Sequence, residues 1–167
     1  DGVTLEASKW ADIFEDFRHR SYWFAGELDK PSSSSMLVPE AFFGHPDNLA
    51  LDRELFGRQT RSREVGDRIH RQKEYLKDRL YEFIGRFDLD LIVAENVLAI
   101  PMHIPLGVAL TEVIVETGIP AIGHHHDFYW ERPRFLLHAP HQTLAAARHD
   151  HVDGAVETAQ HGAHRLA

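Results

Sequence analysis

The chain has 167 residues, with 26 acidic and 18 basic side chains and no cysteine. That length suits one domain with a real hydrophobic core and is short for two complete domains. The net charge of −8 makes nucleic acid a poor candidate partner, because phosphate backbones are bound by clustered Lys and Arg. The absence of cysteine excludes disulfides and thiolate metal sites and fits a reducing compartment, so we expect a cytoplasmic protein.

Membrane insertion is not expected, because Pro or acidic residues interrupt every apolar run before the roughly 18 residues that a spanning helix needs. Peripheral contact with a membrane remains an alternative.

Residues 53–79 carry nine basic and five acidic side chains. We interpret this segment as a solvated helix face with opposite charges at helical spacing, and a phosphate-facing surface is the weaker alternative.

The composition changes after Phe135, so we divide the chain into a domain at residues 1–135 and a tail at 136–167. All nine isoleucines and every aromatic residue lie at or before Phe135, whereas the tail holds eight alanines and six histidines. Such a tail has little apolar surface to offset its ordering entropy, which predicts poor order. A histidine-rich metal tract and a frame-shifted or chimeric end are the alternatives.

The first half of the domain predicts a helix, a short strand and a longer helix. Residues 4–18 carry apolar side chains at helical spacing, among them Trp10 and Phe14. Residues 21–26 (SYWFAG) are typical of a short buried strand. Pro31 and the serines after it indicate a flexible loop, and residues 39–48 continue irregularly. Residues 65–87 predict a long helix.

Residues 89–126 contain the pattern that indicates the fold class. An apolar run (LDLIVAE) ends at Glu95, residues 104–117 are helical in length and are followed by Gly118, and residues 119–126 (IPAIGHHH) form a second apolar run. Strand, helix and strand, with both strands apolar on both faces, predict a parallel βαβ unit. We therefore expect an α/β fold with a Rossmann-like open parallel sheet flanked by helices.

Polar side chains follow both predicted strands. Glu95 and Asn96 end the first, and residues 124–127 (HHHD) end the second. Because ligands bind beyond the carboxyl ends of strands in open parallel sheets, both groups are expected to face one crevice. This position favours His126 and Asp127 as catalytic residues and Glu95 and Asn96 as substrate-binding residues.

Alternation along a strand sends His124 and His126 to one face and His125 to the other. For His124 and His125 a hydrogen-bonded packing role is the alternative to function. His126 ends its strand, which favours function. A metal site built from His124, His126 and Asp127 would support a metal-dependent hydrolase, but no second ligand cluster is evident.

Two further signals point to anion binding. Arg132 and Arg134 could clamp a phosphate, or could instead pair with Glu131 or Glu95. Gly2 precedes the first predicted helix, where it would end a strand-to-helix loop whose N–H groups face an anion. We include Gly2, Arg132 and Arg134 as candidate substrate-binding residues.

Three segments together carry a family resemblance: DGVTLEASKW (residues 1–10), YWFAGELD (22–29) and the run from DLIVAEN to FYWERPRF (90–135). They resemble the N-terminal half of bacterial group 1, or family-4, retaining glycosyltransferases. Position 133 departs from the pattern, because relatives tend to carry an acidic residue where this chain has Pro133. The resemblance stops at Phe135.

The resemblance implies a GT-B enzyme, in which two Rossmann-like domains face each other across a cleft. The N-terminal domain shapes the acceptor side, and the C-terminal domain binds the nucleotide-sugar. By resemblance, the Gly2 loop approaches the donor phosphates, His126 contacts the transferred sugar, and no catalytic metal or other cofactor is needed. The first strand is expected before Asp1 and the donor domain beyond this sequence, so the sheet is expected to be incomplete and the chain alone inactive.

The sequence therefore predicts part of a hexosyltransferase-type enzyme that moves a sugar, with retention, from a nucleotide-sugar donor to an acceptor hydroxyl on a sugar or small molecule. A non-catalytic Rossmann-like remnant or binding module is the first alternative. The metal-dependent hydrolase is the second.

Overall fold

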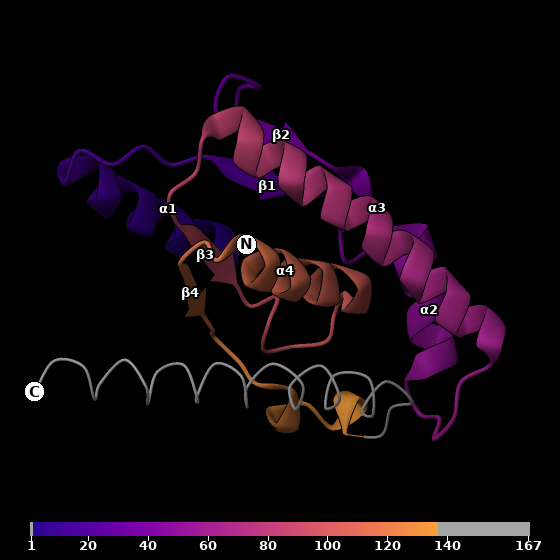
Figure 1. Ribbon diagram of the computed structural model, residues 1–167. Helices are drawn as coiled ribbons and strands as arrows, with labels where there is room; N and C mark the ends of the chain where they lie inside the picture. Colours follow the sequence, from indigo (N-terminus) through magenta and orange to yellow (C-terminus); the bar gives the residue numbers. More distant parts are fainter. Residues whose placement is uncertain (1, 137–167) are drawn as a thin grey trace, which may run out of the picture.

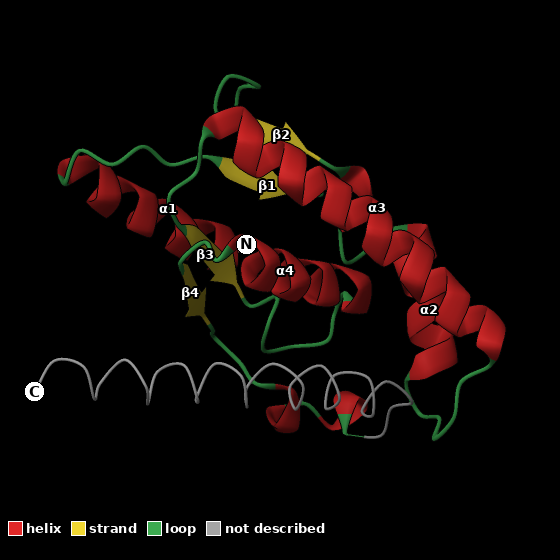
Figure 2. Ribbon diagram, viewed as in Figure 1, coloured by secondary structure: helices red, strands yellow, loops and turns green. Residues whose placement is uncertain are grey.

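The computed structural model describes residues 2–136 and has an α/β fold (Figures 1 and 2). The helices and strands are α1 (Gly2–Asp16), β1 (Trp23–Ala25), β2 (Ser35–Leu37), α2 (Pro46–Leu55), α3 (Arg63–Phe87), β3 (Ile92–Glu95), α4 (Ile104–Thr117) and β4 (Ala121–His124). Short 3₁₀ helices occur at Pro39–Ala41, Tyr129–Glu131 and Pro133–Phe135. The predicted class is confirmed.

The strands form two parallel pairs within the described residues. β1 pairs with β2, and β3 pairs with β4, with Glu95 opposite His124. The β3–α4–β4 segment is therefore the predicted parallel βαβ unit. The two pairs are separate, so the single open Rossmann-like sheet stays a prediction.

Both ends of α4 are defined by the sequence around them. At its start, the buried His103 accepts a hydrogen bond from the Leu106 N–H at 3.2 Å through Nδ1, and its Nε2 donates to the Glu40 carbonyl at 2.8 Å. Burial lowers the pKa of His103, which fits a neutral ring with one donor and one acceptor. At its end, Gly118 adopts φ 66°, the left-handed conformation that glycine accepts without steric cost.

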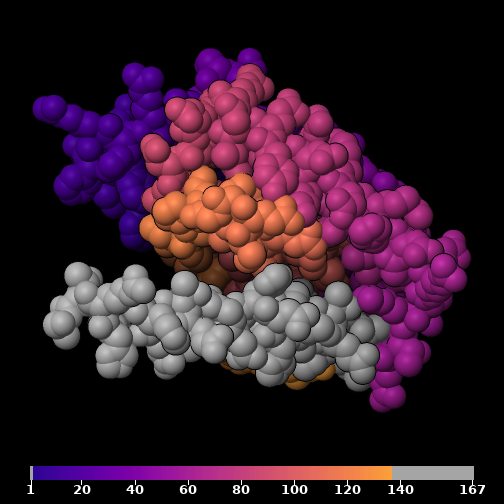
Figure 3. All heavy atoms as spheres, in the orientation of Figure 1, coloured from indigo at the N-terminus to yellow at the C-terminus, as the bar shows by residue number. Residues whose placement is uncertain are grey.

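The main core lies where α3 crosses β2, β3 and α4. Helix α3 runs along the face shown in Figure 3, and its apolar stripe meets side chains from all three elements. The buried members of this core are Met36, Val38, Ala41, Leu76, Leu80, Phe83, Ala94, Ala109, Leu110 and Val113. Burial of this apolar surface is the dominant stabilising contribution and fixes the end of β3 relative to α4.

Ion pairs join α3 to α4 beside this core. Lys73 Nζ and Lys77 Nζ each lie 2.9 Å from Oε2 of Glu112, and Lys77 Nζ lies 2.5 Å from Oε1 of Glu116. The hydrogen bonds from Glu116 and Glu112 raise the pKa of Lys77. Pairs within α3, such as Lys73 with Glu74 and Arg79 with Glu82, agree with the interpretation of residues 53–79, but the Lys73 and Lys77 side chains are 11% and 15% exposed and face α4 instead of the predicted solvent.

Three local predictions were wrong. Strand β2 follows directly after the serines that predicted only a flexible loop, and α2 begins at Pro46 inside the segment predicted to be irregular. Strand β4 was expected to be buried on both faces, yet Ala121, Ile122 and Gly123 are exposed. Within the described residues, β4 pairs with β3 and meets α1 through Trp10 at His124, which leaves its apolar residues at 121–123 exposed.

The tail prediction for residues 136–167 falls almost entirely outside the described residues, which end at Leu136. Within the described part of the chain, no helix is both long and apolar enough to cross a membrane.

We predict that Gly26→Ala lowers the free energy of unfolding by at least about 2 kcal/mol, because a Cβ at this position would overlap the backbone nitrogen and Cα of Phe42. Gly85→Ala is the matched control. A Cβ there meets nothing within 4 Å, so the change should raise the free energy of unfolding by about 0.5–1 kcal/mol. Urea denaturation measures both, and equal effects would contradict the close packing at Gly26.

A second prediction concerns Asp52 on α2. Burial raises the pKa of this carboxyl to about 6, with the Arg134 charge acting in the opposite direction. The pKa of Asp52 is therefore higher in the folded state than in the unfolded state. Its contribution to stability is fully present below the unfolded-state pKa and is lost as the pH rises through about 6. Asp52→Asn should stabilise the protein at pH 7 by about 1 kcal/mol after allowance for partial exposure.

Denaturation midpoints from pH 4 to pH 7 test this prediction, with exposed Asp78→Asn as the control. If the denaturation midpoint of Asp52→Asn depends on pH in the same way as that of the wild type, the prediction is wrong.

Candidate functional site

The ends of β3 and β4 bring one carboxylate and two imidazoles together. Oε2 of Glu95 lies 2.8 Å from Nδ1 of His124 and 3.6 Å from Nε2 of His126. The two imidazole rings stand 4.7 Å apart between centroids at 64°. We call these three residues the Glu95–His124–His126 cluster. The predicted meeting of the two strand ends is confirmed, because parallel pairing places Glu95 beside His124.

Asn96 connects the strand ends through both its backbone and its side chain. Its backbone N–H donates to the His124 carbonyl at 2.9 Å, and its Oδ1 accepts from the His126 N–H at 2.7 Å. Asn96 adopts φ 59°, a left-handed conformation that asparagine tolerates better than most residues. Asn96 therefore holds the backbone of His126 in place, a positioning role next to the cluster.

Helix α1 borders the cluster with two residues, Glu6 and Trp10, that the sequence analysis did not place at the site. The Trp10 ring meets the His124 ring edge-on at 5.6 Å between centroids. The pKa of Glu6 is lowered mainly by its hydrogen bond to Lys9, and also by the charges of His126 and His124, which places Glu6 near the cluster. Glu6 and Trp10 share one face of α1, and only pairing of that face with a strand end could have signalled their position.

Asp127 and Arg132 form an ion pair with each other, so Asp127 lies outside the cluster. The set His124, His126 and Asp127 that would support a hydrolase is therefore not the group brought together here. The carboxylate that joins the two imidazoles is Glu95.

Arg134 and Gly2 differ from expectation. The Arg134 guanidinium lies over the Phe135 ring at 4.4 Å and acts on Asp52 of α2, not on Glu131 or Glu95. Gly2 is the first residue of α1 itself and is exposed, so it does not belong to a loop before the helix.

His125 is not part of the cluster that joins its two neighbours, but β4 ends at His124, so the prediction that His126 ends this strand was wrong. The His125 ring lies against Gly123, where a Cβ would come within 2.6 Å of Nε2, and 6.0 Å from the Phe128 ring centroid. This arrangement supports the packing role for His125. His124 is likewise hydrogen-bonded, to Glu95, and its ring packs against Trp10 of α1, which is the arrangement of the hydrogen-bonded packing alternative.

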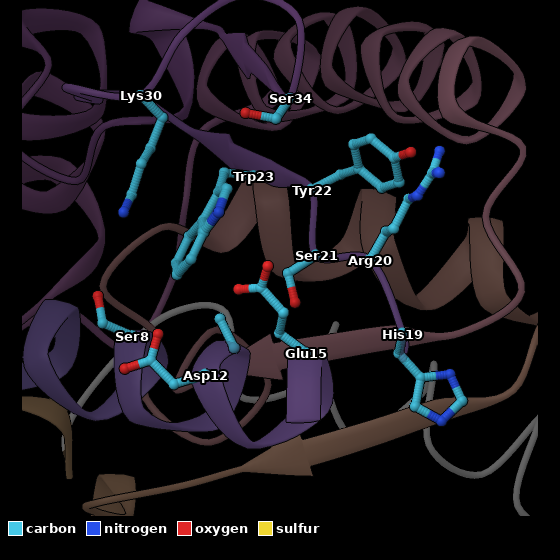
Figure 4. Close-up of a pocket in the computed structure, with 11 residues that line it drawn as sticks. Ser8, Asp12, Glu15, His19, Arg20, Ser21, Tyr22, Trp23, Lys30 and Ser34 are labelled. Atoms are coloured by element: carbon cyan, nitrogen blue, oxygen red, sulfur yellow. The ribbon is translucent and has the colours of Figure 1, made fainter. Parts of the chain in front are cut away.

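A separate cleft of about 320 Å³ lies against the other face of α1 (Figure 4). Asp12 and Glu15 of α1 line it together with the Trp23 ring of β1, over which Lys30 Nζ stands at 4.8 Å. Residues 8, 12 and 15 fall on the opposite side of α1 from Trp10. None of the candidate site residues lines this cleft.

Comparison with known proteins found two relatives. Residues of this chain are 28% identical over 135 positions to the mannosylglucosylglycerate synthase of Petrotoga mobilis, covering 79% of this chain and 30% of the relative. The mannosylglucosylglycerate synthase of Thermotoga maritima is 30% identical over 139 positions, covering 81% and 31%. No family model and no solved structure matches the chain.

These relatives are glycosyltransferases, so the chain is a distant homologue of that class of enzyme. The chain spans about a third of the length of each relative. The resemblance inferred from the sequence is thereby confirmed at the level of glycosyltransferase. The assignment to family 4 and to the GT-B architecture stays a prediction.

We predict that Asn96→Ala lowers the free energy of unfolding by about 1–3 kcal/mol, because it removes the acceptor of the His126 N–H and leaves a left-handed residue without a polar side chain. Asn96→Asp keeps an acceptor at the same place and is the control. Amide exchange at His126 should accelerate in the alanine variant and much less in the aspartate variant. Unchanged exchange would contradict the positioning role.

Proposed function

We propose that this chain is the acceptor-side half of a retaining glycosyltransferase, which transfers a sugar from a nucleotide-sugar to an acceptor hydroxyl. The observation that carries the proposal is the Glu95–His124–His126 cluster at the carboxyl ends of two parallel strands, in a chain homologous to glycosyltransferases. This edge is where ligands bind in open parallel sheets.

In this proposal His126 orients the donor sugar. As the glycosidic bond to the phosphate breaks, positive charge develops on the sugar, and a neutral imidazole can accept a hydrogen bond from a sugar hydroxyl near that charge. Glu95 Oε2 accepts a hydrogen bond from Nδ1 of His124 at 2.8 Å and lies 3.6 Å from Nε2 of His126, so its negative charge is close to both imidazoles. Catalysis here consists of positioning and electrostatic stabilisation.

The remaining candidate residues take supporting roles. Asn96 holds the backbone of His126, and the Asp127–Arg132 pair shapes the adjacent wall on the acceptor side. Gly2 begins a 15-residue helix whose side carries Glu6 and Trp10 beside the cluster, so its N-terminal N–H groups are proposed to face the donor phosphates. Arg134 is not given a substrate-binding role, because its contacts are with Phe135 and the Asp52 region.

The donor side is proposed to lie in a second Rossmann-like domain, which completes a GT-B enzyme. The relatives are about three times as long as the matched segment, which leaves room for such a domain. The same proposal joins the two strand pairs into one sheet through a further strand between β1 and β3, which the family resemblance places before Asp1. No metal cofactor is part of the transfer step, and a cytoplasmic location is proposed.

The relatives suggest the product class. Both are named for the synthesis of mannosylglucosylglycerate, so we propose that this chain serves transfer of a hexose to a small glycoside that carries a carboxylate. Arg132 pairs with Asp127, the residue after His126, and we propose that this guanidinium also faces the carboxylate of the acceptor.

A chimera tests the proposed function. Residues 1–135 replace the matching segment of the Thermotoga maritima synthase, and formation of mannosylglucosylglycerate is measured. We expect transfer in the chimera and a loss of at least about 100-fold in kcat with His126→Ala, because a hydrogen-bonding group at the reacting centre is removed. His125→Ala is the matched control and should retain most of the activity.

The chain of 167 residues alone should form no product from a nucleotide-sugar. Turnover by that chain would contradict the two-domain proposal, and a chimera in which His126→Ala keeps full activity would contradict the role of His126. Circular dichroism of each chimera separates loss of chemistry from loss of folding.

A non-catalytic remnant or binding module is the second candidate, and the exposure of β4 favours it. Ile122 in the middle of this strand is 48% exposed, which is unusual for an apolar strand residue. If the chain is a non-catalytic remnant or binding module, we expect its copies to associate through the exposed strand β4 as the protein concentration increases. Sedimentation velocity of wild-type protein and of Ile122→Lys distinguishes the two candidates.

A further inference from the structure

We infer that the Glu95–His124–His126 cluster binds a divalent transition-metal cation of the zinc type. The inference concerns the same side chains as the proposed transfer site, but neither its observations nor its test depends on sugar transfer. Within the described residues, this is the group in which three ligating side chains each present one atom within 4.8 Å of the others. Two imidazoles and one carboxylate are a donor set that borderline cations such as Zn²⁺, Ni²⁺ and Co²⁺ prefer, whereas Mg²⁺ and Ca²⁺ prefer oxygen donors alone.

The distances between the donor atoms fit a small cation. Ligands at about 2.0–2.1 Å in a tetrahedron lie roughly 3.3 Å from one another. The separations of 2.8 Å from Glu95 Oε2 to His124 Nδ1 and 3.6 Å to His126 Nε2 lie on either side of that value. The donor atoms of His124 and His126 lie within 4.8 Å of each other, so rotation of the side chains would bring all three donors to corners of the tetrahedron.

The backbone and surroundings of the cluster are suited to holding an ion. Hydrogen bonds of Asn96 to the His124 carbonyl and the His126 N–H fix both histidines relative to β3. The side chains of Glu95, His124 and His126 are 19%, 27% and 30% exposed, so they are partly shielded and still reachable. Three protein ligands leave the fourth position of a tetrahedral site for water or another oxygen ligand.

The ion-pair partners of the two carboxylates explain why Glu95, and not Asp127, is the third ligand of the cluster. The Asp127 carboxylate is occupied by Arg132, a cation that would repel a metal ion. Glu95 has no Lys or Arg among its ion-pair partners in the described structure, and its two partners are the imidazoles themselves. Binding a cation would replace the contacts among these three groups by bonds to the ion.

The experiment is titration of the untagged 167-residue chain with Zn²⁺ by calorimetry, and with Co²⁺ as a spectroscopic and paramagnetic probe. We expect one equivalent bound at this site. The visible d–d bands of Co²⁺ should indicate tetrahedral coordination, and the amide signals of residues 94–96 and 123–127 should broaden. An excess of Mg²⁺ should not displace the bound Zn²⁺ or Co²⁺.

Variants assign the binding to the cluster. Glu95→Gln and His126→Gln, which keep size and polarity, should each weaken Zn²⁺ binding by at least about 100-fold, because each removes one of three ligands. His125→Gln is the matched control and should bind as the wild type does. The six histidines of residues 136–167 are present in every variant, so any binding by them contributes equally.

The inference is overturned if Glu95→Gln and His126→Gln bind Zn²⁺ as tightly as the wild type, or if Co²⁺ broadens only signals of residues 137–167. Circular dichroism of each variant shows whether folding is retained, and the Co²⁺ broadening pattern of wild-type protein decides the question even where a variant unfolds. Because metal binding and product formation are measured separately, failure of one leaves the other standing.

Discussion

The parallel pairing of β3 with β4 is the constraint on which the site depends. A one-residue shift in this register would send His124 to the opposite face and separate it from Glu95. The register in turn depends on α4, which connects the two strands and is fixed at its start by His103 and at its end by Gly118. Packing of α3 on α4, with the Lys73 and Lys77 ion pairs beside it, holds this unit in place.

The sequence predicted the part of the fold in which local signals and tertiary packing agree. The α4 bounds at residues 104–117 follow from a long apolar run and the glycine after it, and α3 follows from its apolar periodicity. Strand β2 was missed because the serines before it indicate a loop, while Ser35 itself is buried and donates to the Lys30 and Pro31 carbonyls. Here a tertiary environment overrides local preference.

The candidate site was predictable to the extent that strand ends determine it. Glu95, Asn96 and His126 were found because they follow apolar strands, and the structure brings them together. The alternative metal set with Asp127 does not form, because Arg132, five positions later in the sequence, pairs with Asp127. Trp10 and Glu6 could not be placed, since a helix contacts a strand end more than 100 residues away only through the tertiary fold.

The two sides of the site differ in how firmly the fold holds them. On the strand side, Ala94 next to Glu95 is 4% exposed and belongs to the main core, so the carboxylate stands on a rigid base. On the helix side, α1 has no buried residue, and Leu5 and Ile13 are 66% and 47% exposed. Regions with little buried apolar surface open at lower free energy than core elements. The cluster therefore stands on strands anchored in the core, whereas α1, which meets it through Trp10, is held by little buried apolar surface.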